Sequence, residues 1–106
     1  MTNWSETLPL TRESVARHAL KCGGVLRLLS TTRMGPDVFF VVNSENLDAS
    51  LTDLLSGISY NHQLTHYLGQ RGVGFRFYPT NDAAERSQVE LIELAKWHPP
   101  CNERQT

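Results

Sequence analysis

The sequence predicts an α+β domain with a small, three-stranded, largely antiparallel sheet flanked by helices. Two apolar runs of strand length, residues 25–30 and 38–43, are separated by a turn containing Gly-Pro, which is typical of an antiparallel hairpin with a long loop. A third strand pattern, residues 74–79, alternates aromatic residues with Arg76 and ends at a proline. Stretches with helical spacing of apolar residues precede, separate and follow these strands.

The N-terminal part of the chain predicts a lead-in segment followed by a first helix. Residues 1–10 carry three apolar side chains that are available to pack on the domain: Trp4, Leu8 and Leu10. Thr11 suits the N-cap of a helix over residues 12–22. Gly23 and Gly24 end this helix, because glycine tolerates positive φ beyond a helix end.

Two further helices are expected between the second and third strands. Asn46 or Ser44 caps the first of them, and Gly57 ends it. The second covers residues 61–69. The first has a single apolar stripe, which consists of Leu47, Leu51, Leu54 and Leu55.

The last helix begins after Asp82, which is expected to form a capping box with Glu85. The double proline of HPPCN ends it. Five side chains, all apolar except Gln88, line one face, and Glu90 lies on the flank, where Arg86 can pair with it at i,i+4. The residues of that face are Ala84, Gln88, Leu91, Ile92 and Ala95.

Length and composition indicate one domain over residues 1–106. The formal net charge is −1, without the basic excess that a non-specific nucleic-acid binder usually shows. Residues 1–10 do not resemble a secretory signal, and no apolar stretch approaches the roughly 18 residues of a membrane span. We therefore expect a cytoplasmic protein in which Cys22 and Cys101 are reduced thiols.

The segment from Asp82 to Asn102, DAAERSQVELIELAKWHPPCN, resembles the closing segment of the GIY-YIG nuclease family. It places Glu90 and Asn102 at the positions of the family's metal-binding glutamate and terminal asparagine. The resemblance runs from Gly23 to Asn102 and implies a three-stranded antiparallel sheet flanked by helices, to which this chain adds an N-terminal helix. The other matching segments are Gly24-Val25-Leu26 and Phe40-Val41-Val42 for the two family motifs, and Asn46-Leu47 for the start of the family's first helix.

The resemblance implies a chemistry that this chain has largely lost. The family hydrolyses a phosphodiester with one divalent metal held by the glutamate, a tyrosine that activates the nucleophile and an arginine that stabilises charge on the phosphate. The corresponding positions here are Leu26 and Phe40 for the tyrosines, Val42 for a motif glycine and Ser50 for the arginine. We therefore expect the scaffold without the reaction and without a cofactor. A divalent metal such as magnesium would bind Glu90 only if the protein is active.

Glu90 and Asn102 also have purely structural interpretations. Glu90 is expected to be a solvated surface side chain rather than a metal ligand. Asn102 is expected to satisfy backbone groups in the HPPCN turn, as asparagine does in many loops.

Histidines and cysteines occur in three closely spaced pairs that a metal could share. We expect instead that Cys22 is a small core residue and that the histidines lie on partly exposed faces, because a structural zinc needs four converging ligands. The pairs are His18 with Cys22, His62 with His66, and His98 with Cys101.

Four arginines lie on or near the predicted sheet and its loops: Arg27, Arg33, Arg71 and Arg76. If they converge, they form a phosphate-binding patch for nucleic acid. The strand GFRFYPT is also typical of a base-stacking platform, although we favour packing of its aromatic side chains beneath helices.

Three functions are consistent with these features. The leading hypothesis is a GIY-YIG-like binding module, not an enzyme, whose ligand is a protein or a nucleic acid. The second is a metal-dependent endonuclease in which Tyr60, His66, Tyr67 or Arg27 replaces the missing groups. The third is a homodimeric interaction domain unrelated to nucleic acid, which uses the apolar second strand and Trp4.

Overall fold

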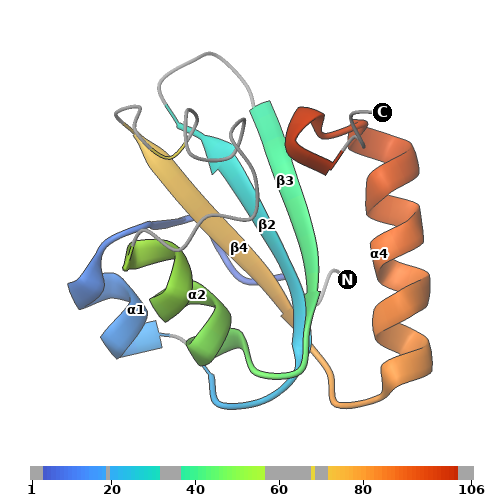
Figure 1. The fold of residues 1–106 in the computed structure, drawn as a ribbon, viewed down its shortest axis with the longest axis horizontal. Helices are drawn as coiled ribbons and strands as arrows, with labels where there is room; N and C mark the ends of the chain where they lie inside the picture. Colours follow the sequence, from blue (N-terminus) through green and yellow to red (C-terminus); the bar gives the residue numbers. More distant parts are fainter. Residues whose placement is uncertain (1–3, 19, 32–36, 57–67, 69–71, 103–106) are drawn as a thin grey trace.

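Four antiparallel strands form the centre of the molecule in a computed structural model, which describes residues 4–18, 20–31, 37–56, 68 and 72–102 (Figure 1). The sheet order is β1-β4-β2-β3, and the strands span Leu8–Pro9 (β1), Gly24–Ser30 (β2), Asp37–Ser44 (β3) and Val73–Pro79 (β4). The predicted α+β class and the antiparallel pairing of the three longer strands are confirmed.

The fourth strand, β1, corrects the predicted strand count. It lies inside the predicted lead-in segment and pairs with Phe75 and Gly74 on the outer edge of β4. Two residues are too few to show an alternating pattern, so the sequence carried no signal for β1.

A β-bulge interrupts the β2–β3 hairpin. Leu28 pairs with Phe40, whereas the next residue, Leu29, pairs with Val38, so the register shifts by one residue at Phe39. The extra residue breaks the strict alternation of faces. As a result, Phe39 and Phe40 both contribute to the same apolar core.

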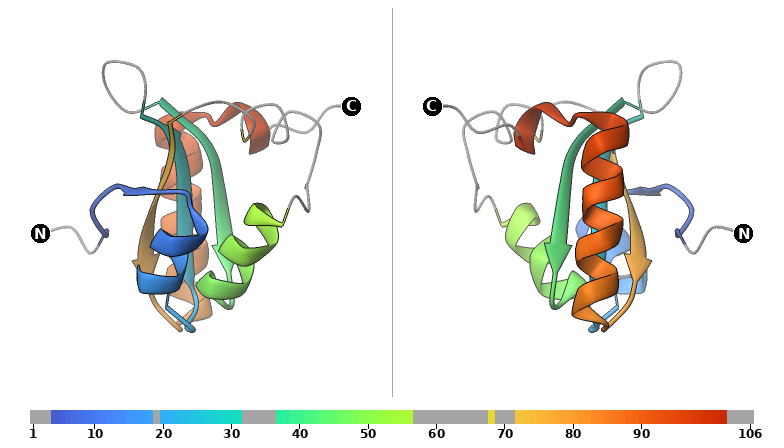
Figure 2. Two further views of the ribbon diagram at one scale, coloured as in Figure 1. Left: turned by 90° about the vertical axis from the view of Figure 1, so that its left-hand side faces the viewer. Right: turned by 90° about the vertical axis from the view of Figure 1, so that its right-hand side faces the viewer.

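Helices cover both faces of the sheet (Figure 2). α1, Arg12–His18, and α2, Leu47–Leu55, pack on one face, and α4, Ala83–Trp97, packs on the other. α1 ends at His18 rather than at Cys22 as predicted. Among the described residues, none of the helices is long and apolar enough to cross a membrane.

The start of α2 distinguishes its two candidate caps. Asn46 is the N-cap, and its Oδ1 accepts a hydrogen bond from Ala49 N at 3.1 Å. The hydroxyl of Ser44 instead accepts from Asn46 N, one residue before the helix. The helix predicted over residues 61–69 lies outside the described residues apart from Leu68.

The two faces of the sheet bury different kinds of side chain. The core beneath α1 and α2 is apolar, whereas the face beneath α4 combines valines and leucines with tryptophans and charged groups. The apolar core consists of Leu8, Val15, Leu26, Leu28, Phe39, Phe40, Leu47, Leu51, Leu54, Phe75, Phe77 and Cys101. The core beneath α4 consists of Val25, Leu29, Val38 and Val41, with Trp4, Tyr78, Val89, Leu94 and Trp97 packed against it.

The ends of α4 are fixed by local contacts. Asp82 is the N-cap and accepts from the backbone N of Ala84 and Glu85. The predicted capping box is only half formed, because the carboxylate of Glu85 accepts from the hydroxyls of Thr80 and Tyr78. His98 ends the helix in the left-handed conformation, with φ of 46°, and a 3-10 turn, η1, follows at Pro100–Asn102.

The face of α4 that packs on the sheet is not the face that looked most apolar in the sequence. Leu91 and Ile92 are 67% and 58% exposed. The packed face instead carries Arg86 and Glu93, which are buried, together with the partly buried Val89, Leu94 and Trp97. The number of apolar residues on a face of α4 therefore does not identify the face that packs on the sheet, because Arg86 and Glu93, two charged side chains, are buried there.

Candidate functional site

Glu90 lies half-buried on α4 and contacts β3 through Asn43. Asn43 Nδ2 donates a hydrogen bond to Glu90 Oε1 at 3.4 Å, and Arg86 Nε donates to Asn43 Oδ1 at 3.0 Å. The predicted pairing of Arg86 with Glu90 is therefore replaced by a relay through Asn43. We call these three residues the Glu90 network.

Arg86 connects the network to Thr80, the residue that follows β4. Its Nη1 donates to the carbonyl oxygen of Thr80 at 3.3 Å. A Cβ atom added at Gly23 would lie 2.7 Å from the same nitrogen, so the close approach of this arginine requires glycine there. Because Arg86 holds the oxygen of Asn43, the amide N–H groups of Asn43 point toward Glu90.

Asn102 forms two hydrogen bonds with the outer edge of β3. Its Oδ1 accepts from Val41 N and its Nδ2 donates to Val41 O, both at 2.7 Å. The expectation that Asn102 satisfies backbone groups holds, but these groups belong to β3 rather than to the HPPCN turn. A paired edge strand cannot recruit another strand at this point.

The motif positions lie on the other face of the sheet or at its end. Leu26 is fully buried and Phe40 is 5% exposed, and both pack in the apolar core beneath α1 and α2. Val42 is half-buried against the same core. Ser50 lies on α2, where its hydroxyl is 2.6 Å from the hydroxyl of Ser44. None of these four side chains supplies a cation or an acidic hydroxyl like that of tyrosine.

Arg27 is part of a buried ion pair, which corrects its assignment to a surface phosphate-binding patch. Its Nη2 and Nε lie 2.5 and 2.7 Å from Glu93 Oε1. The guanidinium carbon lies 4.0 Å from the ring centroid of Trp4 and 5.3 Å from that of Trp97, and Trp97 Nε1 also donates to Glu93. Burial lowers the pKa of Arg27, which the hydrogen bond and charge of Glu93 oppose.

Of the other predicted patch arginines, the structure describes Arg76. Arg76, the residue opposite Arg27 on β4, is half-buried, and its Nε donates to the backbone oxygen of Ser5 at 2.8 Å. Arg33 and Arg71 lie outside the described residues. Of the four arginines, the two that the structure describes are thus both engaged with the protein itself.

The residues around Glu90 provide a poor cage for a divalent cation. Among the described residues, no group of three or more His, Cys, Asp and Glu side chains could hold a metal ion. Magnesium binds through one or two carboxylates with water and substrate oxygens, so Glu90 alone would have to supply the protein ligand. The neighbouring groups, Asn43 N–H and Arg86, are hydrogen-bond donors, which do not ligate cations.

The histidine and cysteine pairs also fail to form a described metal site. His18 ends α1 and Cys22 follows it in the next loop, so these two residues do not share one helix face. His62 and His66 lie outside the described residues. Burial raises the pKa of the Cys101 thiol to about 11, which keeps it protonated in the apolar core.

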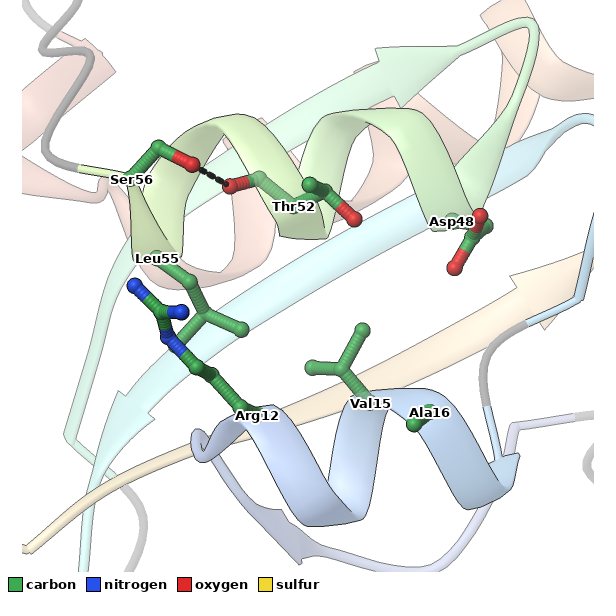
Figure 3. Close-up of a pocket in the computed structure, with 7 residues that line it drawn as sticks. All are labelled: Arg12, Val15, Ala16, Asp48, Thr52, Leu55 and Ser56. Atoms are coloured by element: carbon green, nitrogen blue, oxygen red, sulfur yellow. Dashed lines mark hydrogen bonds between the residues drawn. The ribbon is translucent and has the colours of Figure 1, made fainter.

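A pocket lies between α1 and α2, on the sheet face opposite Glu90 (Figure 3). Its volume is about 250 Å³. Val15 points into it, and Arg12 and Asp48 lie at opposite ends. The full lining is Arg12, Val15, Ala16, Asp48, Thr52, Leu55 and Ser56.

Sequence reasoning missed Asn43, Glu93 and Trp97. Arg86, Glu90, Glu93 and Trp97 do follow helical spacing, at i, i+4, i+7 and i+11, which places them together on one side of α4. That pattern was available in the sequence, but polar residues are not normally interpreted as a buried face. Asn43 gave no signal, because its role depends on the packing of α4 over β3.

At the level of sequence, no protein-family model matches the chain and no curated protein matches it. Solved structures do. The GIY-YIG N-terminal endonuclease domain of UvrC from Thermotoga maritima, bound to its catalytic divalent cation magnesium, matches with a TM-score of 0.64 at 14% identity, over 88% of this chain and 100% of that chain. The chain has the GIY-YIG fold.

Point mutants of the same UvrC domain give similar GIY-YIG matches. One in which tyrosine is replaced by phenylalanine has a TM-score of 0.63 at 15% identity, and one in which asparagine is replaced by alanine has 0.61 at 14%. Both cover 89% of this chain and 100% of the matched chain. At such identities the likeness establishes the GIY-YIG fold alone, and function has to be argued from the site.

Proposed function

We propose that this GIY-YIG domain is a binding module that does not cleave phosphodiesters. The observation that carries the proposal is the burial of Leu26 and Phe40, which the sequence resemblance aligns with the two motif tyrosines. Neither side chain can take or give a proton at neutral pH. A nucleophile at this site would therefore lack the group that activates it.

The remaining catalytic positions support the same proposal. Ser50, at the position of the family's arginine, carries no charge, and its hydroxyl pairs with Ser44. Losing one preorganised charge-stabilising group commonly costs about 10²–10³ in rate. Leu26, Phe40 and Ser50 therefore supply neither a proton-transfer group nor a cation for phosphodiester cleavage.

A protein is the favoured ligand of this module. A nucleic-acid site needs several accessible cations along the phosphate backbone, and Arg27 and Arg76 are engaged with Glu93 and the Ser5 carbonyl instead. The pocket between α1 and α2 has an apolar wall and one charge of each sign at its ends. Such mixed chemistry fits a peptide better than a polyanion.

A cleavage assay tests the absence of nuclease activity. Branched, single-stranded and duplex DNA are incubated with the protein and Mg²⁺ or Mn²⁺, and products are compared with those of Glu90→Gln and Asp53→Asn. Asp53 is an exposed carboxylate on α2, which makes it a matched control. We expect no metal-dependent cutting. Cutting that disappears in Glu90→Gln and persists in Asp53→Asn would refute the proposal.

The second candidate function is a nuclease with relocated groups, and one observation favours it. Glu90 keeps a half-exposed carboxylate, and Asn102 keeps its place after the helix. Arg27 is a poor substitute for a catalytic group because it is buried against Glu93, and Tyr60, His66 and Tyr67 lie outside the described residues. Titration with Mg²⁺, followed by NMR shifts of the Glu90 amide, distinguishes the two candidates, since only the nuclease requires binding there.

A further inference from the structure

The outer face of α4 is apolar at its centre and faces solvent. Leu91 and Ile92 are 67% and 58% exposed, which is unusual for large aliphatic side chains on a helix that is already packed on a sheet. All members of this face are exposed. We define the α4 outer face as Ala84, Gln88, Leu91, Ile92 and Ala95.

The spacing along the α4 outer face is that of a helix–helix seam. Ala84, Gln88, Leu91 and Ala95 recur at i, i+4, i+7 and i+11, the alternating three- and four-residue steps of a heptad pattern. Alanines at both ends of the seam allow the backbone of a second helix to approach closely. The opposite side of the same helix, with Arg86 and Glu93, is fully used by the sheet. The outer face is therefore available to a partner without any rearrangement of the domain.

We propose that the α4 outer face pairs with the same face of a second copy of this chain, with the two helices antiparallel. Charge complementarity selects this occupant and this orientation. The first turn of α4 is acidic, with Asp82 and Glu85, and the last turn is basic, with Lys96. A two-fold axis through the middle of the helix brings the acidic end of one copy to the basic end of the other, whereas a parallel pair would bring like charges together.

The helix dipoles favour the same orientation, since antiparallel neighbours place opposite partial charges side by side. In this arrangement Leu91 and Ile92 of the two copies lie near the axis and form the apolar centre, and the charged ends form its rim. This is the usual anatomy of a protein–protein interface. Because the α4 outer face is complementary to itself under a two-fold rotation, a second copy of the chain is sufficient to account for its exposed apolar side chains.

The dimer surface differs from the one expected from sequence. The apolar second strand, β3, is covered by α4 and by the core beneath α1 and α2, and its outer edge is held by Asn102 at Val41. Trp4 packs over Arg27. Trp4 and the edge of β3 at Val41 are thus already engaged within the domain, whereas the α4 outer face is exposed.

One helix pair gives a small interface, so association should be reversible and concentration-dependent. Sedimentation velocity from roughly 10 µM to roughly 1 mM covers the range expected for such contacts. The wild-type protein should move from monomer to dimer across this range. Leu91→Glu should remain monomeric, because it places two carboxylates at the centre of the interface.

The matched control is Leu20→Glu, which changes another exposed leucine, 42% accessible and outside α4. It should dimerise like the wild type. Lys96→Glu tests the orientation: an antiparallel pair is weakened because acidic ends then meet, while a parallel pair would show no such loss. Circular dichroism should be unchanged in all three variants, since each side chain is exposed.

A wild-type protein that stays monomeric throughout the range would overturn the proposal, as would a Leu91→Glu variant that dimerises normally. The proposal goes beyond the binding function suggested above and does not depend on it. A monomeric protein could still lack nuclease activity, and a dimer could still cut DNA, so the two tests fail separately.

Discussion

The two faces of the sheet differ in what they have kept. The face beneath α1 and α2 is a continuous apolar core, which includes Leu26 and Phe40, the residues that the sequence resemblance aligns with the family's tyrosines. The face beneath α4 keeps polar and charged groups, namely the Glu90 network and the Arg27–Glu93 pair. The comparison teaches that the two sides of one small sheet can differ in chemistry: one side is an apolar core, and the other buries hydrogen-bonded polar and charged groups.

The energetics of the two faces differ accordingly. Each fully buried leucine or phenylalanine beneath α1 and α2 contributes about 1.5–3 kcal/mol through removal from water. The buried ion pair beneath α4 adds little net stability, because desolvation of both charges offsets their attraction. Its hydrogen bonds are nevertheless complete: within the part of the chain that the structure describes, no buried side-chain nitrogen or oxygen lacks a partner. Removing one member of the Arg27–Glu93 pair should therefore destabilise the protein by more than the small net contribution of the pair, because the other charge stays buried without a counter-ion.

The largest effect is expected for Glu93→Ala. This change leaves Arg27 buried between two tryptophans without its counter-ion, which should lower the free energy of unfolding by about 3–5 kcal/mol. Urea denaturation measures it. The control is Glu90→Ala, three residues earlier, whose one described contact is 3.4 Å long; it should cost less than about 1 kcal/mol. An equal loss of unfolding free energy in Glu93→Ala and Glu90→Ala would contradict the view that the buried Arg27–Glu93 pair matters more for stability than the Glu90 network.

On the face beneath α1 and α2, the variant Leu26→Tyr introduces the residue type that the family has at the corresponding position. The site is fully buried, so the larger ring overpacks the core and its hydroxyl loses water, for an expected cost of about 3 kcal/mol. Phe40→Tyr adds only the hydroxyl and should cost less in the same urea titration. A Leu26→Tyr protein as stable as the wild type would mean that this face still has room for the missing group.

The smallest of the three effects on stability is expected at the outer edge of β3, where Asn102 binds the backbone of Val41. Asn102→Ala removes two hydrogen bonds to Val41, each worth about 1 kcal/mol net, and should lower stability by about 2 kcal/mol. Hydrogen exchange should show a specific loss of protection at the Val41 amide. Asn46→Ala, which removes the cap of α2, should cost about 1 kcal/mol without a specific change at Val41. If hydrogen exchange at the Val41 amide is unaffected by Asn102→Ala, the two hydrogen bonds from Asn102 do not stabilise β3.

Local patterns predicted much of the fold. The three longer strands follow from their apolar runs, and the caps of α2 and α4 follow from Asn46 and Asp82, because these signals depend on a few neighbouring residues. The same reasoning failed for the packed face of α4. Leu91 and Ile92 lie on the more apolar side of the helix, but α4 buries Arg86 and Glu93, whose partners Asn43 and Arg27 are distant in sequence.

The sequence by itself determined the order of the longer elements, the residue types at the positions compared with the family motifs, and the Glu90-to-Asn102 spacing, since all of these are properties of residue type and position. Only the tertiary structure decided what those residues do. It turned Arg27 inward to Glu93, attached Asn102 to β3 and left the α4 outer face in solvent. The physical reason is that a hydrogen bond or an ion pair across some 60 residues depends on how two elements pack, and no local pattern encodes that geometry.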